Sequence, residues 1–211
     1  MRVDRSFGFV DLCGFTAFSD RHGDEQVVLV LAEMRMLLRE SSARRGVRIV
    51  KWLGDGAMLS STMSDALAGL IVELDQRMAE QIPALPIRAG LASGKVIMFE
   101  GDDYIGTPVN VAARLCNIAE PHEILATVEV ASARPPWIHA EPGRPIEVRG
   151  MSREVEVRSL SLANADDPVV DPVCGLTLDR RDSVGREERP RFCSEACLGS
   201  WLDRLKGRLT I

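Results

Sequence analysis

The stretch VRIVKWLGDGAMLS, residues 47–60, decides the fold. Residues 47–53 are mostly β-branched or aromatic and predict a strand, and residues 57–60 predict the strand that returns beside it. Between them, Gly54-Asp55-Gly56 predicts a tight turn, because the Asp-Gly dipeptide is typical of hairpin tips. We therefore expect a β-hairpin that presents Asp55 at its tip.

Elements on both sides of this hairpin indicate a larger α+β domain. Upstream, residues 6–11 predict a strand, and residues 24–44 predict a helix because their apolar side chains recur at helical spacing. Downstream, we expect a helix capped by Ser64 and a strand over residues 87–99 with a bulge or bend at Gly94. Beyond it we expect a loop at 101–106, a helix at 108–119 and short strands near 123–126, 146–149 and 155–160. This alternation predicts helices packed on a mostly antiparallel sheet.

Composition limits the class of protein. The 211 residues are 45% hydrophobic and 27% charged, with a net charge of −5, which is typical of a globular chain and gives no general attraction to nucleic acid. The longest apolar run, residues 27–32, is far shorter than the roughly 18 residues that span a bilayer. Residues 1–11 lack the apolar core of a secretory signal. We therefore expect a cytoplasmic protein with reduced thiols that binds neither nucleic acid nor membrane.

Two carboxylates lie at the ends of predicted strands. Asp11 follows the first strand, and Asp55 lies at the hairpin tip. Carboxylates at such points can converge at one end of a sheet and bind hard cations through oxygen. Taken alone, Asp55 is more simply explained by turn chemistry, because Asp is common in tight turns.

Three motifs surround these carboxylates in a fixed order: FVDLCGFT at 9–16, KWLGDG at 51–56 and YIGTPVNVAAR at 104–114. With these motifs the chain resembles the catalytic domain of the class III nucleotidyl cyclases, the adenylate and guanylate cyclases, over about residues 6–160. The segment AEPHEILAT at 119–127 extends the likeness. The resemblance implies a ferredoxin-like βαββαβ core for a domain of residues 1–160, which agrees with the order of predicted elements.

The resemblance also implies roles for individual residues. Asp11 and Asp55 match the family's metal ligands and would hold two Mg²⁺ or Mn²⁺ ions, with the carbonyl of Leu12 as a possible further ligand. Two such ions would clamp an in-line displacement at phosphorus. Asn110 and Arg114 match the catalytic pair that orients the ribose and stabilises charge at the α-phosphate. These two residues are four apart on a predicted helix and therefore share one face.

Lys51 and Asp103 match the positions that bind the base. A lysine only donates hydrogen bonds and an ionised aspartate only accepts them, so this pair complements adenine and not guanine. Guanylate cyclases typically carry Glu and Cys at these two places. The resemblance therefore implies an adenylate cyclase that converts ATP to 3′,5′-cyclic AMP and pyrophosphate. Asp102 is adjacent to Asp103, and the sequence leaves open which of the two contacts the base.

In this family one subunit supplies the metal ligands, and the other supplies the base-binding and catalytic residues. A chain that carries all six implies a head-to-tail homodimer with two equivalent sites. Arg149 and Arg153 are both candidates for a contact with the triphosphate, and the sequence does not choose between them. The alternative function is a catalytically silent module of the same fold that responds to nucleotide or metal.

The C-terminal segment has a different pattern. Residues 161–168 are small and polar and predict a linker, and residues 169–211 are too few for a large hydrophobic core. Three of the five cysteines, Cys174, Cys193 and Cys197, lie here, within DPVCG at 171–175 and FCSEAC at 192–197. Three thiolates are good ligands for Zn²⁺ or another soft metal.

This segment resembles the YHS domain, a small treble-clef-like metal-binding module related to the TRASH family. The aromatic pair that normally precedes the second cysteine motif is reduced here to Arg191-Phe192, and the sequence shows no obvious fourth ligand. A helical tail with buried, reduced cysteines is the alternative. If a metal binds, its role could be structural, or the module could sense metal or thiol redox state.

Overall fold

The computed structural model describes residues 1–81, 85–99, 103–149, 151, 153–163, 169–170, 173, 177–178, 192 and 194–208. The backbone forms two compact units, Met1–Leu162 and Ala163–Ile211. Within the described residues, no helix is long and apolar enough to cross a membrane.

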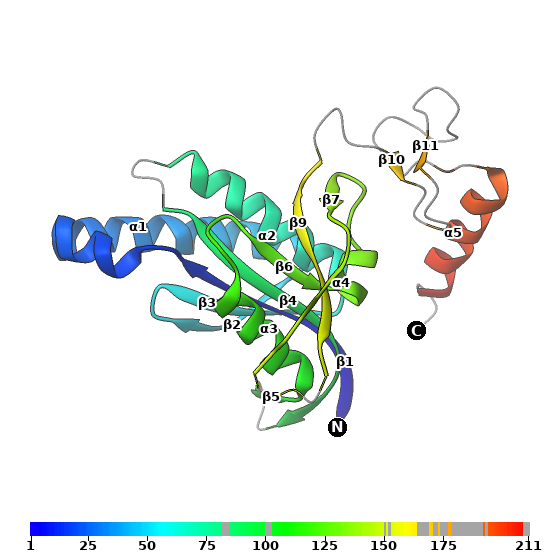
Figure 1. The fold of residues 1–211 in the computed structure, drawn as a ribbon, viewed down its shortest axis with the longest axis horizontal. Helices are drawn as coiled ribbons and strands as arrows, with labels where there is room; N and C mark the ends of the chain where they lie inside the picture. The colour runs from blue at the N-terminus through cyan, green and yellow to red at the C-terminus, as the bar shows by residue number, and fades with distance from the viewer. Residues whose placement is uncertain are drawn as a thin grey trace. The chain divides into compact units, whose positions relative to one another are not determined.

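A twisted sheet forms the centre of the first unit (Figure 1). Its strands lie in the order β2, β3, β1, β4, β6, β9, β7, while β5 pairs with β4 and β8 with β9. All the pairs are antiparallel except the parallel pair of β4 with β6. The strands are β1 (Arg2–Leu12), β2 (Arg48–Leu53), β3 (Gly56–Ser61), β4 (Ile87–Phe99), β5 (Asp103–Ile105), β6 (Ile124–Thr127), β7 (Ile138–Ala140), β8 (Arg144–Ile146) and β9 (Val155–Leu162).

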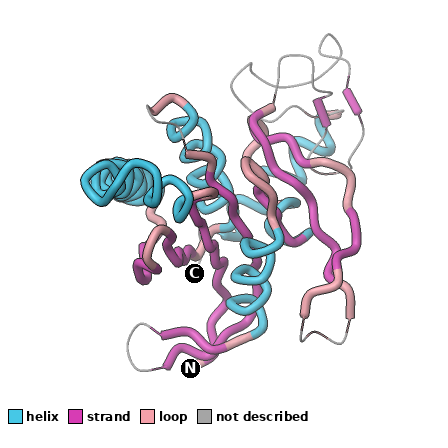
Figure 2. The backbone as a smooth tube through the Cα atoms, turned by 60° about the vertical axis from the view of Figure 1, so that its left-hand side comes forward, coloured by secondary structure: helices cyan, strands magenta, loops and turns pink. Residues whose placement is uncertain are grey.

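Helices cover both faces of this sheet. α1 (Phe15–Arg45), α2 (Ser64–Ala79) and the short α4 (Val128–Ser132) share one apolar cluster with one face of the strands, and α3 (Thr107–Ile118) packs on the other face. Helices and strands are distinguished by colour in Figure 2. The helix between β1 and β2 and the helix between β3 and β4 lie on the same face, as the ferredoxin-like arrangement requires. The α+β prediction is therefore confirmed for this unit.

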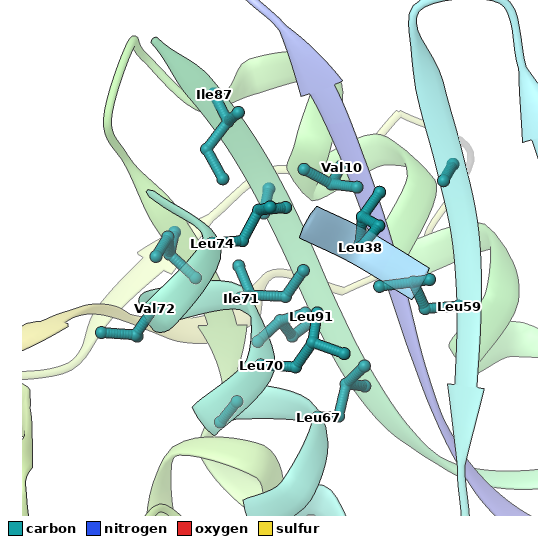
Figure 3. Close-up of a cluster of buried hydrophobic side chains, with 14 of the residues drawn as sticks. Val10, Leu38, Leu59, Leu67, Leu70, Ile71, Val72, Leu74, Ile87 and Leu91 are labelled. Atoms are coloured by element: carbon teal, nitrogen blue, oxygen red, sulfur yellow. The ribbon is translucent and has the colours of Figure 1, made fainter. Parts of the chain in front are cut away.

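Strand alternation decides which side chains enter each cluster. In β1, Val10 and Leu12 pack toward α1 and α2, whereas Phe7 and Phe9 pack toward α3. Figure 3 shows the first cluster, in which the apolar side of α2 meets β4. The labelled side chains there are Val10, Leu38, Leu59, Leu67, Leu70, Ile71, Val72, Leu74, Ile87 and Leu91.

Several boundaries differ from the sequence predictions for local reasons. The helix expected at Asp24 is preceded by two further helical turns, and Gly23 interrupts the two parts with φ 78° and ψ 170°. Ser64 is not the cap of α2 but its first residue, and its hydroxyl lies 2.7 Å from that of Ser6. Gly94 causes no bulge in the pairing with β1, because the register continues through it opposite Arg5.

The described residues of the second unit include a two-stranded antiparallel pair and a helix. β10 (Val169–Val170) pairs with β11 (Thr177–Leu178), and α5 spans Glu195–Arg208. Phe192 is buried, and its ring centroid lies 6.0 Å from that of Trp201. Residues 164–168 lie outside the described part of the chain, so the linker at 161–168 stays a prediction, and β9 itself continues to Leu162.

Candidate active site on the first unit

Asp11 lies at the C-terminal end of β1, on the face that α3 covers. The position follows from alternation along the strand, because Phe7 and Phe9 of the same strand pack in the α3 cluster. Asp11 pairs with Gly56 of β3 on one side and with Arg88 of β4 on the other. Its carboxylate therefore lies where three neighbouring strands meet.

Asp55 lies in the two-residue turn between β2 and β3. Leu53 pairs with Gly56, so the turn residues are Gly54 and Asp55, one position earlier than the Asp-Gly dipeptide expected from sequence. Gly54 has a φ of 67°, and His122 is the only non-glycine with positive φ among the described residues. Positive φ at the first turn position alone is typical of a type II′ turn, which favours glycine there.

The carboxylates of Asp11 and Asp55 act on each other. Burial raises the pKa of Asp55, and the negative charge of Asp11 raises it further. Gly56 makes this proximity possible: a Cβ at position 56 would lie 2.5 Å from the carbonyl oxygen of Val10 and 3.1 Å from Oδ1 of Asp11. Two half-buried carboxylates that repel each other in this way fit a divalent cation bound through oxygen.

Arg88 is a site residue that the sequence analysis missed. Its Nη2 and Nε donate to Oδ2 of Asp11 at 2.7 and 3.2 Å, and its Nη1 donates to the carbonyl oxygen of Asn117 at 3.4 Å. The bond to Asp11 raises the pKa of Arg88. Register could have found the contact, because antiparallel pairing of the two predicted strands places residue 88 opposite residue 11.

Lys51 and Asp103 come together although 52 positions separate them in the chain. Nζ of Lys51 lies 3.6 Å from Oδ1 of Asp103, and both side chains are about half exposed. Lys51 is in β2, and Asp103 begins β5, a short strand where the sequence predicted a loop. Asp103 therefore lies beside Lys51, and Asp102 is outside the described residues.

Asn110 and Arg114 are exposed on α3, whereas Val111 and Leu115 of the same helix are buried. Neither of the two polar side chains has a hydrogen-bond or ion-pair partner among the described residues. Gly90 of β4 lets α3 pack closely on the sheet, because a Cβ there would lie 2.2 Å from both Ala112 O and Cys116 N. The structure thus places the predicted catalytic pair on the same face of the sheet as Asp11.

A pocket of about 270 Å³ opens beside Asp11. Its lining comes from the ends of β1 and β2, the start of β3 and the last turns of α3: Phe9, Val10, Asp11, Leu53, Gly56, Ala113, Cys116 and Asn117. Neither Asn110 nor Arg114 is among these residues. One chain therefore brings Lys51 to Asp103 and Asp11 near Asp55, but it does not place the α3 pair in the pocket beside Asp11.

Comparison with known proteins identifies the fold family. A family profile described as the adenylate and guanylate cyclase catalytic domain matches residues 5–160. The chain belongs to this family. The cyclase domain thus defined contains all six residues assigned by resemblance, together with Arg88.

Individual relatives agree with this assignment. The chain is 34% identical over 153 residues to an uncharacterized protein of Mycobacterium tuberculosis (strain ATCC 25618 / H37Rv), and the match covers 72% of this chain and 40% of the relative. It is 33% identical over 131 residues to an adenylate cyclase of Streptomyces coelicolor, and the match covers 61% of this chain and 34% of that relative. The adenylyl cyclase CyaB from P. aeruginosa superposes with a TM-score of 0.68 at 26% identity, covering 79% of this chain and 97% of that one. The chain thus spans less than half the length of the two sequence relatives.

The remaining predicted site residues belong to the C-terminal segment and to the end of the first unit. In the described part of the chain, no cluster of three or more His, Cys, Asp or Glu side chains could hold a metal. Cys197 is half-buried in the first turn of α5, while Cys174 and Cys193 lie outside the described residues. Arg149 and Arg153 are both exposed, and the structure does not favour either one as a triphosphate contact.

Proposed function

We propose that this cyclase domain converts ATP to 3′,5′-cyclic AMP and pyrophosphate at the interface of a head-to-tail homodimer. The observation that carries the choice of substrate is the pairing of Lys51 with Asp103, whose Nζ and Oδ1 atoms lie 3.6 Å apart. Lysine would donate to N1 of adenine, and the carboxylate would accept from its N6 amino group. Guanine presents the opposite pattern and would leave both groups unpaired.

Asp11 and Asp55 are proposed to hold the divalent cations. Their half-buried oxygens are the ligand type that Mg²⁺ and Mn²⁺ prefer, and their mutual repulsion is relieved when positive charge binds between them. Bound cations would supply the charge that activates the ribose 3′-hydroxyl and stabilises the leaving pyrophosphate. Arg88 now neutralises Asp11 and competes for the same carboxylate. We infer that, once a cation binds Asp11, the guanidinium of Arg88 is released and can bind the triphosphate oxygens.

The homodimer proposal is supported by what one chain does not bring together. Arg114 and Asn110 lie on the exposed side of α3 and do not line the pocket beside Asp11. That pocket, at about 270 Å³, is smaller than the roughly 300–1,000 Å³ typical of small-molecule sites. We infer that a second copy supplies Asn110 to orient the ribose and Arg114 to stabilise charge at the α-phosphorus. The 3′-oxygen attacks that phosphorus, and the bond to pyrophosphate breaks.

The first test of the function measures cyclic nucleotide formation. Purified protein is assayed with ATP and with GTP in the presence of Mn²⁺, beside Asp55→Ala and, as a control outside the site, Asp65→Ala in the first turn of α2. We expect cyclic AMP from the wild type and from the control, little cyclic GMP, and at least a hundredfold loss in Asp55→Ala, as the loss of a principal charge-stabilising group implies. No product from either nucleotide would favour the silent module.

The second test addresses the shared site. An Asp11→Ala chain and an Arg114→Ala chain are each expected to be inactive, because each homodimer lacks part of both sites. Mixing the two should restore one intact site in every heterodimer. Unchanged inactivity after mixing, with heterodimers shown by native mass spectrometry, would contradict the head-to-tail arrangement.

We also propose that residues 169–211 form a YHS-like module that binds Zn²⁺ or another soft metal through Cys174, Cys193 and Cys197. The placement of Cys197 in the first turn of α5 and the packing of Phe192 near Trp201 are compatible with a small metal-stabilised core. Elemental analysis should find one metal per chain, and Cys197→Ser should lose it. A cyclase rate that changes during zinc titration would identify a sensor, and a flat response would identify a structural site. Reduced thiols of this kind suit a cytoplasmic protein.

A further inference from the structure

Trp52 connects the β2–β3 hairpin, which carries Asp55, to α1. It occupies the position in β2 two residues before the turn, and its ring packs against the cluster that α1 and α2 share. Cζ of Arg35 lies 5.0 Å from the ring centroid, and Cζ of Arg39 lies 5.4 Å from it. Both arginines belong to α1 and are four apart, so they share one helical face. One indole ring therefore holds two guanidinium groups by cation–π attraction.

Arg35 also contacts the turn of the hairpin. Its Nη2 donates a hydrogen bond to the carbonyl oxygen of Gly54 at 3.3 Å. Its Nε is buried and has no hydrogen-bond partner within the described residues. The guanidinium is therefore held by the ring of Trp52 and by this single backbone contact, which reaches the turn residue immediately before Asp55.

The carbonyl of Gly54 belongs to the peptide that joins Gly54 to Asp55. In a two-residue turn, rotation of this peptide interconverts types I′ and II′ and changes φ of the second residue, which here is Asp55. A donor on the carbonyl oxygen opposes that rotation, because the oxygen would move away from it. The direction of the Asp55 side chain therefore depends on the bond from Arg35.

We propose that Arg35 is a positioning residue for divalent-cation binding at Asp55, acting through the Gly54 carbonyl with Trp52 as its support. The inference rests on the proposed function, because it concerns the same cation site. Arg35 contacts the backbone of the turn through the Gly54 carbonyl, whereas Asp11 and Arg88 are the charged side chains that shift the pKa of Asp55.

The test compares three variants of the full chain. Arg35→Met removes both the donor and the cation, Arg35→Lys keeps a cationic donor, and Arg39→Met removes the other cation on the same ring while leaving the Gly54 bond intact. Mn²⁺ binding is measured through the loss of the electron paramagnetic resonance signal of the free ion. The Mn²⁺ concentration for half-maximal cyclase rate is measured in parallel, and thermal unfolding shows that each variant is folded.

We expect Arg35→Met to weaken Mn²⁺ binding about tenfold and to raise the half-maximal Mn²⁺ concentration equally, because misplacing one ligand acts on the bound state. At saturating Mn²⁺, kcat should fall by less than about threefold. Arg35→Lys and Arg39→Met should both bind Mn²⁺ within about threefold of the wild type. A role in folding alone would lower the unfolding temperature of both methionine variants without this difference in binding.

Equal Mn²⁺ binding in Arg35→Met and Arg39→Met would overturn the inference, and so would an Arg35→Lys variant as weak as Arg35→Met. The binding measurement needs no turnover, so it separates the two proposals. If the wild type binds Mn²⁺ but forms no cyclic nucleotide, the proposed function fails and the binding comparison still decides the role of Arg35. If the wild type binds no Mn²⁺, both proposals fail.

Discussion

Replacing Gly90 by alanine should displace α3 from the sheet. The new Cβ would lie 2.2 Å from the carbonyl oxygen of Ala112 and from the amide nitrogen of Cys116, and 2.7 Å from Cβ of Leu115. Two of these three atoms are backbone and cannot rotate away. Restoring an ordinary separation of 3.4 Å from 2.2 Å requires the helix to withdraw by about 1.2 Å.

The size of the effect follows from this displacement. Overpacking of this kind costs about 1–3 kcal/mol of unfolding free energy. α3 carries Asn110 and Arg114, so a shift near 1 Å should also reduce kcat by about a hundredfold if these residues act on the substrate. Urea denaturation measures the first quantity, and cyclic AMP formation at saturating Mn²⁺ and ATP measures the second.

Gly8→Ala is the matched control, because Gly8 lies in the adjacent strand and its new Cβ would approach only side-chain atoms. These are Cδ2 of Leu91 at 3.0 Å and Cδ1 of Leu67 at 3.2 Å, which can rotate slightly and which belong to the opposite face of the sheet. We expect a modest loss of stability with nearly normal turnover. Equal turnover in Gly90→Ala and Gly8→Ala would refute the argument that Gly90 sets the position of α3.

Three further outcomes follow from the charges around the site. The raised pKa of Asp55 means that the fold favours the protonated form of this carboxyl group. Asp55→Asn should therefore raise the unfolding temperature of the metal-free protein at pH 7. Thermal scans at lower pH should show this gain vanish as the pH falls toward about 4. Arg88→Leu should lower the free energy of unfolding, measured by urea denaturation, by about 1–2 kcal/mol, a value between the ranges for exposed and buried ion pairs. The same variant should bind Mn²⁺ more tightly in the absence of nucleotide. Weaker Mn²⁺ binding would contradict competition between Arg88 and the cation for Asp11. Burial, together with the charge of Asp11, raises the pKa of the Cys116 thiol to about 12. Peptide mapping of the folded protein after iodoacetamide treatment at pH 8 should therefore find this cysteine unmodified. Rapid labelling would contradict this expectation, because it would show that the thiol is accessible.

Elements with strong local patterns could be predicted from the sequence. β4 runs from Ile87 to Phe99 as expected, and α3 begins within one residue of its predicted start, because an apolar strand pattern and a proline at a helix N-terminus are local signals. β5 and β7 could not be predicted in this way. Each has three residues, and each exists because a neighbouring strand offers free backbone groups for pairing.

The sequence alone determined the βαββαβ order, the hairpin that carries Asp55, and the residue types available for cations and for a purine base. The tertiary structure alone decided that Arg88 bonds to Asp11, that Arg35 bonds to the Gly54 carbonyl, and that the exposed side of α3 lies outside the pocket. The two hydrogen bonds join positions that are far apart in the chain. Strand register sets the first, the contact of α1 with Trp52 supports the second, and the close packing of α3 at Gly90 places the third, so each depends on how separate elements pack together.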